Sequence, residues 1–299
     1  MPWFMKIGLG TVQFGMDYGV SNQTGKTNQA EVNLILNKAL ELGIRKLDTA
    51  YLYGDSESVL GQNQKELNGF DVITKTRKFG NTAFTKDDAK LIRESFLESL
   101  SRLKLNKVYG LMFHDSSDLL KENSGYLWDE LVSLKSEDKV TKVGVSVYSL
   151  NQTEEILKKY PIEIIQFPLN IYDHSFLQNG FLSKLKEIDI EIHVRSVFLQ
   201  GLALMSSTEL PAYFKSVKNH IQECQEMLRS RGVTMLEASL NFIKSIKQVD
   251  FAILGINNIS QLLEIIDSYH SGKNFEGIDY SKFAIFDESI TNPSKWKLK

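Results

Sequence analysis

Eight short apolar segments alternate with helical patterns along the 299 residues of the chain, and this alternation limits the fold more than any other feature. Strands that are apolar on both faces are typical of parallel sheets covered by helices. Strict alternation favours a closed (β/α)8 barrel over an open doubly wound sheet. The predicted strands are Lys6–Val12, Ile44–Leu47, Val72–Ile73, Val108–Phe113, Val143–Val147, Ile164–Phe167, Ile190–Val197 and Phe251–Leu254. We therefore predict an α/β fold in which residues 1–299 form a single (β/α)8 TIM barrel domain.

Nearly all the connections between these strands contain apolar residues at helical spacing, which predicts a helix in each of them. A polar loop through Lys26 follows the first strand, and Asn28 with Glu31 and Thr85 with Asp88 have the spacing of capping boxes. The predicted helices run from Asn28 to Gly43, over Ser56–Gln64, from Thr85 to Leu103, and over Leu127–Leu134, Gln152–Lys159, Phe176–Glu187, Phe214–Arg231, Met235–Lys244 and Ser260–Tyr269. With only five prolines and no Gly/Ser linker, the chain shows no domain boundary.

The composition of the chain indicates which binding partners and which cellular compartment to expect. The net charge is −2 and the charges are spread along the chain, so we expect no nucleic-acid partner. The longest apolar runs fall well short of the ~20 residues that cross a bilayer, and the first ten residues lack the apolar core of a signal peptide. The single cysteine, Cys224, suits a reducing cytosol, and we interpret it as a packing residue without a nearby histidine. We therefore expect a cytoplasmic protein with no membrane partner; the sequence leaves its oligomeric state open.

Four ionisable residues follow the carboxyl ends of three neighbouring predicted strands. Asp48 ends the second strand in the stretch GIRKLDTAYLYG, Tyr53 follows in the loop, Lys75 ends the third strand, and His114 follows the fourth. Each has an ordinary structural explanation, such as a helix cap, a core aromatic or a solvated lysine. In a barrel, however, these strand ends meet on the face that carries active sites. We therefore predict that the four side chains converge there.

The residue types suit proton transfer to or from a substrate oxygen. A tyrosine has a pKa of ~10, and lowering it to ~7 requires about 4 kcal/mol of preference for the phenolate. One ammonium at ~4 Å in a partly desolvated site supplies about that much. We expect Lys75 to lower the pKa of Tyr53, Asp48 to hold Lys75 charged while opposing the shift, and His114 to donate a hydrogen bond to the substrate. The set contains no nucleophile and no metal-binding pattern.

These motifs together resemble the aldo-keto reductase family. The resemblance rests on GIRKLDTAYLYG, on VITK ending in Lys75 and on MFHD containing His114, and it extends from LGTVQFG at Leu9–Gly15 to the last helix. It implies a (β/α)8 barrel, hydride transfer between NADP(H) or NAD(H) and a carbonyl or alcohol, and a small-molecule aldehyde, ketone or sugar as substrate. It also implies that Asp48, Tyr53, Lys75 and His114 form the catalytic tetrad, with Tyr53 as general acid and base.

The resemblance also assigns residues to the cofactor. The residues that it places around the nicotinamide and pyrophosphate are Gly10, Thr11, Asp48, Ser146, Gln166, Arg195, Ser196, Phe198, Gln200 and Gly201. After the last strand, Gly255, Asn257, Gln261 and Glu264 lie in the loop and helix for the adenosine end. Many family members place Lys or Arg for the 2′-phosphate where this chain has Gly255, Asn257 and Gln261, and Ile265 replaces an adenine-contacting Asn. We therefore expect a weak preference between NADPH and NADH.

Arg195 occupies the place of an aromatic residue that usually stacks on the nicotinamide. Two interpretations stay open. The guanidinium could lie beside the nicotinamide and repel its cationic, oxidised form by roughly 1 kcal/mol at an open rim. Alternatively, it turns aside to pair with a carboxylate or to bind an anionic substrate.

Two other functional classes compete with the oxidoreductase. Barrel subunits of some potassium channels also resemble this family, so a cofactor-binding regulatory subunit with little turnover fits the same four residues. An aldolase or isomerase would instead use Lys75 as a Schiff-base nucleophile. The specific substrate is not apparent, because Tyr18, Phe84 and Tyr126 in the loops of the predicted face suit either a pocket wall or ordinary packing.

Overall fold

The computed structural model describes residues 6–297 and contains a closed barrel of parallel strands in chain order. The strands are β1 (Ile7–Gly10), β2 (Lys46–Asp48), β3 (Asp71–Lys75), β4 (Val108–Phe113), β5 (Val140–Ser146), β6 (Ile164–Pro168), β7 (Glu191–Arg195) and β8 (Phe251–Gly255). Pairing of β1 with β8 closes the barrel, with Gly10 beside Gly255. The predicted (β/α)8 barrel is therefore confirmed. The predicted absence of a signal peptide concerns the first ten residues, of which residues 1–5 lie outside the described part.

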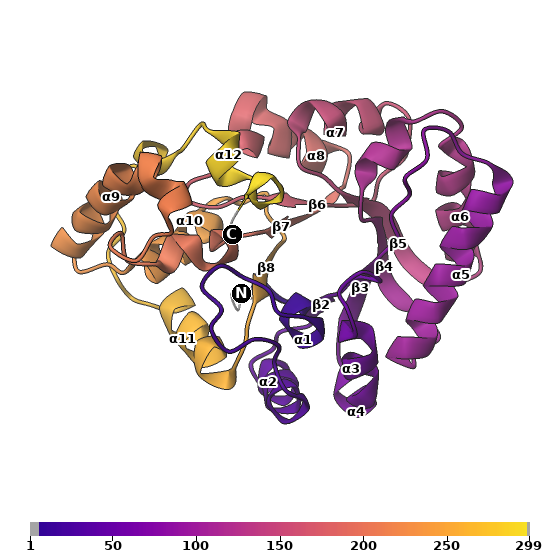
Figure 1. Cartoon of the computed structure of the whole chain (residues 1–299), viewed down its shortest axis with the longest axis horizontal. Helices are drawn as coiled ribbons and strands as arrows, with labels where there is room; N and C mark the ends of the chain where they lie inside the picture. Colours follow the sequence, from indigo (N-terminus) through magenta and orange to yellow (C-terminus); the bar gives the residue numbers. More distant parts are fainter. Residues whose placement is uncertain (1–5, 298–299) are drawn as a thin grey trace.

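Helices surround the strands on all sides of the barrel (Figure 1). The α-helices are α1 (Val12–Gly15), α2 (Gln29–Glu41), α3 (Ser56–Gln62), α4 (Gln64–Leu67), α5 (Lys86–Leu103), α6 (Gly125–Ser136), α7 (Leu150–Leu157), α8 (Phe181–Glu187), α9 (Lys218–Ser230), α10 (Met235–Ser245), α11 (Ile259–Tyr269) and α12 (Glu288–Thr291). Short 3₁₀ turns lie over Ser116–Leu120, Ser175–Gly180, Leu199–Leu204, Ala212–Val217, Tyr280–Phe283 and Pro293–Lys295. No helix within residues 6–297 has the length and apolar character that a membrane crossing requires.

Several predicted boundaries are wrong for identifiable reasons. The first strand ends at Gly10, because Val12 begins the short helix α1. The predicted helix Phe176–Glu187 is broken where Asn179 and Gly180 adopt left-handed backbone conformations, with φ of 55° and 66°. The seventh strand ends at Arg195, because Ser196 has a φ of 58°. Left-handed residues end regular structure, and nothing in the spacing of apolar residues predicts them.

Helix capping agrees with the prediction at one of the two expected sites. Thr85 and Asp88 exchange hydrogen bonds as a complete capping box at the start of α5. At α2 the Asn28 side chain accepts a hydrogen bond from Glu31 N, but the Glu31 carboxylate accepts from the backbone N of Ile259 instead of returning to Asn28. The second capping box is therefore only half formed. Its glutamate ties α2 to the beginning of α11.

Cys224 packs as expected, but its surroundings differ from the prediction. The thiol is buried in α9, and its Sγ lies 3.7 Å from His220 Nε2, one helical turn away. The expectation of no nearby histidine was therefore wrong. Burial raises the pKa of Cys224 to about 11, so the thiol stays protonated and inert at neutral pH.

The N-terminal end of the barrel holds a network of ionisable side chains joined by salt bridges and hydrogen bonds. We call it the N-terminal ion cluster, and its members are Lys46, Tyr109, Lys142, Glu191 and His193. The Glu191 carboxylate accepts hydrogen bonds from Lys142 Nζ at 2.7 Å, from His193 Nε2 at 2.7 Å and from the Tyr109 hydroxyl. Lys46 Nζ lies 3.5 Å from Glu191 Oε1 and 3.2 Å from the centre of the Tyr109 ring. The cluster lies at the opposite end of the strands from the predicted site.

Candidate active site

The four predicted catalytic residues meet at the C-terminal ends of β2, β3 and β4. Asp48 is the last residue of β2, Lys75 is the last residue of β3, and His114 directly follows β4. These strands are direct neighbours in the barrel, so their ends lie side by side. Tyr53 returns from the β2 loop, where its hydroxyl lies 3.4 Å from Lys75 Nζ. The side chains that the sequence separates by up to 66 positions thus form one group.

Lys75 is the centre of this group and is almost fully buried, with 1% of its surface exposed. Its Nζ donates to Asp48 Oδ2 at 2.6 Å and to the backbone oxygen of Thr49 at 2.9 Å. The third direction of the ammonium points at the Tyr53 hydroxyl. A buried charge is tolerated when it is paired and hydrogen-bonded, and both conditions are met here. The ion pair thereby fixes the ammonium beside the tyrosine.

The first loop holds the tyrosine loop in place. Thr11 donates to the backbone oxygen of Asp48 through its Oγ1 at 2.9 Å and through its N at 3.0 Å. Gly15, the last residue of α1, packs so closely on the loop that a Cβ there would lie 1.8 Å from the backbone carbonyl oxygen of Tyr53. The motif LGTVQFG therefore positions Tyr53 through backbone contacts that only a glycine at residue 15 permits.

Burial governs the protonation of Tyr53. Burial and the neighbouring Asp48 carboxylate raise the pKa of Tyr53 well above its usual range, and the positive charge of Arg195 only partly opposes the shift. The expected lowering of this pKa by Lys75 was wrong, because the charge of Lys75 is neutralised by Asp48 while removal from water disfavours the phenolate. Tyr53 is therefore protonated at neutral pH and is available as a proton donor.

His114 is neutral for a similar reason. Burial and the positive charges of Lys75, Lys78 and Arg195 lower the pKa of His114 to about 3. Its ring packs edge-on against the Tyr53 ring, with centroids 5.6 Å apart, and its Nδ1 is buried without a hydrogen-bond partner. A neutral imidazole that faces the cavity beside Tyr53 suits a hydrogen bond to a substrate oxygen.

A cavity of ≈ 430 Å³ opens beside this group and extends from β4 around to α11. Asp48, Tyr53 and His114 line its catalytic end, whereas Lys75 lies behind them. The predicted cofactor residues that line it are Gly10, Thr11, Ser146, Arg195, Ser196, Phe198, Gln200, Gly201, Gly255, Asn257, Gln261 and Glu264. Cavities of about 300–1,000 Å³ are typical of small-molecule sites.

Gln166 is the one predicted cofactor residue that does not line the cavity. It is fully buried, and its Nε2 donates to Asp48 Oδ1 at 2.8 Å. Its Oε1 has no hydrogen-bond partner. A buried acceptor without a partner is costly, so this oxygen suits a donor such as the amide group of a bound ligand. In the structure itself Gln166 orients the carboxylate that pairs with Lys75.

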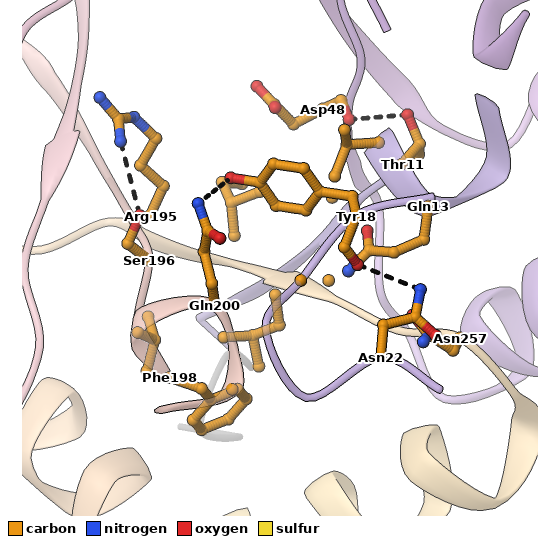
Figure 2. Close-up of a pocket in the computed structure, with 18 of the residues that line it drawn as sticks. Thr11, Gln13, Tyr18, Asn22, Asp48, Arg195, Ser196, Phe198, Gln200 and Asn257 are labelled. Carbon is orange, nitrogen blue, oxygen red and sulfur yellow. Dashed lines mark hydrogen bonds between the residues drawn. The ribbon is translucent and has the colours of Figure 1, made fainter. Parts of the chain in front are cut away.

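Two loops meet across the middle of the cavity. After β7, residues Ser196, Leu199, Gln200 and Gly201 have φ between 47° and 92°, which gives a tight, irregular turn. Gln200 Nε2 donates to the Tyr18 hydroxyl at 3.0 Å, and the backbone N of Val20 donates to Gln200 O at 3.0 Å. Figure 2 shows Tyr18 and Gln200 approaching each other from opposite loops. For three loop aromatics the sequence left open whether they form a pocket wall or pack: Tyr18 lines the cavity, Phe84 is buried in the core, and Tyr126 does not line the cavity.

The far end of the cavity lies at the beginning of α11. Asn258 caps this helix by accepting from the backbone N of Gln261 at 2.9 Å, and Gln261 Oε1 accepts from Asn257 N at 2.8 Å. A helix N-terminus of this kind favours an anionic group. Among the described residues that line the cavity, Arg195 alone is a lysine or arginine, and it lies at the other end, while the acidic Glu264 lies at this one.

Several lining residues escaped prediction. Gln13 faces Gly255, where an added Cβ would lie 2.2 Å from Gln13 Nε2, and Gln13 Oε1 is buried without a partner. The other residues that the sequence did not indicate are Val12, Gly19, Ser21, Asn22, Tyr148, Val197, Leu204, Leu236, Ile253 and Leu254. Their types carry no chemical signal, and only the paths of the loops bring them to the cavity.

Arg195 is held by its neighbours but has no acidic partner. Its guanidinium stacks over the Tyr148 ring at 4.1 Å from the centroid. Nη2 donates to Val147 O at 3.3 Å, and Nη1 donates to Ser196 Oγ at 3.5 Å. Within residues 6–297, the arginines that pair with carboxylates are Arg93 and Arg102, and Arg195 is not one of them. The interpretation in which Arg195 turns aside to pair with a carboxylate of the chain was therefore wrong.

Comparisons with known proteins identify the family of the chain and agree with its barrel fold. The model of the family described as the aldo/keto reductase family matches residues 6–283. The chain is 26% identical over 285 residues to the uncharacterized oxidoreductase YqkF of Bacillus subtilis, covering 88% of this chain and 86% of that protein. It is 26% identical over 156 residues to the methylglyoxal reductase DkgA of Escherichia coli, covering 52% and 53% of the two chains. The solved structure of the aldo-keto reductase AKR11C1 from Bacillus halodurans, in its holo form, superimposes with a TM-score of 0.71 at 20% identity, covering 93% of this chain and 89% of that one.

Proposed function

Because the chain belongs to the aldo/keto reductase family, we propose that it is a NAD(P)H-dependent oxidoreductase that reduces the carbonyl group of a small aldehyde, ketone or sugar. One observation carries the proposal: Lys75 Nζ lies between the Asp48 carboxylate at 2.6 Å and the Tyr53 hydroxyl at 3.4 Å, next to a cavity. A relative named as a methylglyoxal reductase supports a small carbonyl compound as the substrate.

Each member of the tetrad has a distinct role in this proposal. Protonated Tyr53 donates its hydroxyl proton to the substrate oxygen as negative charge develops there. The Lys75 ammonium stabilises the phenolate that this transfer leaves, and Asp48 holds the ammonium in position. Neutral His114 donates a hydrogen bond that orients the carbonyl. In the reverse direction the same tyrosine would accept the proton of an alcohol.

The residues present also fit a nicotinamide cofactor. Two buried amide oxygens without partners, those of Gln13 and Gln166, lie at the cavity or directly behind it. The cavity runs past the irregular turn after β7 to the N-terminus of α11, which suits an elongated ligand with anionic groups. When bound, the reduced nicotinamide would supply the hydride. Ser146, Ser196 and Gln200 would hold the cofactor by hydrogen bonds, and Gly10 and Gly201 would leave room for it.

A screen of carbonyl compounds tests the proposal. Aldehydes, ketones and sugars are offered with NADPH and NADH, and cofactor oxidation is followed by nicotinamide absorbance. Turnover on at least one class is expected. Tight cofactor binding without turnover on any compound would instead favour the regulatory-subunit class.

The Schiff-base alternative has a specific obstacle. Lys75 does not line the cavity, and its Nζ donates to Asp48 and to the backbone oxygen of Thr49. Burial lowers the pKa of Lys75, but the Asp48 carboxylate opposes this shift. A nucleophilic amine must be neutral and must reach the substrate carbonyl. Borohydride added with substrate should therefore leave Lys75 unmodified, and a borohydride-stable adduct on Lys75 would restore the aldolase or isomerase.

A further inference from the structure

We infer that Arg195 binds an oxyanion group of the substrate, so that the carbonyl compounds reduced here carry a carboxylate or a phosphate. This inference rests on the proposed function and names the class of substrate for the same site. It starts from an imbalance of charge at the catalytic end of the cavity. There, the charges of Lys75 and Asp48 neutralise each other at 2.6 Å, whereas within the described part of the chain no carboxylate forms a salt bridge with the guanidinium of Arg195.

The guanidinium lines the same cavity as Tyr53 and His114, so a substrate bound there can contact all three side chains. In agreement, the charge of Arg195 contributes to the pKa shifts of Tyr53, Lys75 and His114. In Figure 2 its head is directed away from the loop that carries Phe198 and Gln200. The middle of the cavity, which suits the anionic part of the cofactor, is therefore on the other side of this residue.

The stacking on Tyr148 prepares the guanidinium for an anion. A flat guanidinium on an aromatic face keeps its edge available, and that edge matches the two oxygens of a carboxylate or phosphate. Arg195 donates only two hydrogen bonds, at 3.3 and 3.5 Å, both long. Arg195 is half-buried and lines the cavity, so its remaining N–H groups are available to a ligand there. The structure thus holds a positioned cation in the same cavity as the proton donor, and no carboxylate of residues 6–297 forms a salt bridge with it.

The test compares anionic and neutral carbonyl compounds of the same skeleton. Glyoxylate is paired with its amide, longer aldehyde acids are paired with their methyl esters, and glycolaldehyde phosphate is paired with glycolaldehyde. Wild type should show a higher kcat/KM for the anionic member of at least one pair. The ratio of kcat/KM for the anionic member to kcat/KM for the neutral member is compared between pairs. The pair with the larger ratio shows whether the site prefers a carboxylate or a phosphate.

Variants assign the preference to Arg195. Arg195→Met should lower kcat/KM for the anionic member about 10- to 100-fold more than it lowers kcat/KM for the neutral member, as expected for a lost charged hydrogen bond. Arg195→Lys should restore part of the preference. Arg229→Met, which removes an exposed arginine on α9, is the matched control and should behave as wild type.

A binding measurement keeps the inference separate from the proposed function. Glycolate and phosphoglycolate are titrated into the complex with reduced cofactor, whose fluorescence reports binding without turnover. If wild type binds these anions and Arg195→Met does not, the inference is supported even when no tested carbonyl is reduced. In that case only the proposed reductase activity is contradicted. Equal kcat/KM for both members of every pair, with anion binding unchanged in Arg195→Met, would overturn the inference. Loss of reduced-cofactor affinity in Arg195→Met, with equal losses for anionic and neutral substrates, would also overturn it and assign Arg195 to the cofactor.

Discussion

At the scale of single residues, Asp48 connects three neighbouring side chains through its carboxylate and its backbone oxygen. Its Oδ2 accepts from Lys75, its Oδ1 accepts from Gln166, and its backbone oxygen accepts from Thr11. The carboxylate is buried, with 3% of the residue exposed. A change here is therefore expected to alter the charge beside Tyr53 and the orientation of Gln166 together.

The protonation of His114 gives a prediction for the pH dependence. Because its pKa is lowered to about 3, the imidazole is protonated only below that pH and stays neutral above it. We expect kcat/KM for reduction of a neutral carbonyl to show no inflection from His114 between about pH 5 and 8, the range in which an unperturbed histidine titrates. An inflection near pH 6.5 that disappears in His114→Gln would contradict the neutral assignment.

The charge of Arg195 should also affect the redox forms of the cofactor differently. A guanidinium near the nicotinamide repels the cationic oxidised ring and leaves the neutral reduced ring unaffected. Arg195→Tyr is therefore expected to tighten the oxidised form relative to the reduced form by about fivefold, or roughly 1 kcal/mol. Dissociation constants for both forms, measured in wild type and variant, decide this. Equal shifts, or none, would place the guanidinium too far from the ring to matter.

At the scale of elements, the ends of β2, β3, β4, β7 and β8 divide the site into a catalytic end and a cofactor end. The tetrad could be predicted from the sequence because each member directly follows a recognisable apolar strand, or lies within a few residues of one. The presence of Gln13 and Tyr148 at the cavity could not be predicted, because the conformations of their loops decide which side chains reach the cavity. The left-handed φ of Ser196 and the break at Asn179 illustrate the same limit: the surroundings impose them, and no local pattern specifies them.

The beginning of α11 gives a prediction for cofactor preference. A charged hydrogen bond to the 2′-phosphate is worth ~1.5–3 kcal/mol, and Gly255, Asn257 and Gln261 supply none. We expect NADH to be usable and the preference for NADPH to be weak. Gln261→Arg should strengthen NADPH binding selectively, whereas Gln261→Met, which loses the same amide without adding charge, should not.

Dissociation constants for NADPH and NADH in the three proteins test this. A wild-type preference for NADPH of about a thousandfold, or ~4 kcal/mol, would show that a basic residue from elsewhere reaches the phosphate.

At the scale of the whole molecule, the barrel separates the catalytic group from the N-terminal ion cluster. The barrel itself could be predicted because eight buried parallel strands leave few alternative arrangements. The ion cluster could not, since Lys46, Glu191 and His193 lie inside two predicted strands that are far apart in the sequence, and nothing in the sequence indicates that their side chains meet. Only closure of the barrel brings β2 and β7 to the same interior.

Glu191 links this cluster to the stability of the fold. Burial alone would raise its pKa, but hydrogen bonds from His193, Lys142 and Tyr109 outweigh burial and hold the pKa of Glu191 well below its usual range. Because the pKa is lowered in the folded state, the stabilisation is complete above the unfolded value of ~4.3 and is lost as the pH falls below it. Removing one partner of a buried ion pair costs about 3–5 kcal/mol.

We therefore expect Glu191→Gln to lower the free energy of unfolding by about 3–5 kcal/mol at neutral pH. Urea unfolding of wild type and variant measures the difference, which should shrink below about pH 4. Glu187→Gln, an exposed glutamate on α8, is the matched control and should change little. Equal stability of Glu191→Gln and wild type at neutral pH would show that the cluster contributes nothing net.

The most direct test of the proposed reductase is to follow deuterium from the reduced cofactor into the alcohol product, in wild type and in Tyr53→Phe. Wild type should transfer the label to the carbon of the former carbonyl. Tyr53→Phe lacks only the proton donor, so it should bind the cofactor with nearly unchanged affinity while product forms about 10²- to 10⁴-fold more slowly. Unlabelled product from wild type, or wild-type turnover by Tyr53→Phe, would contradict hydride transfer with Tyr53 as the acid.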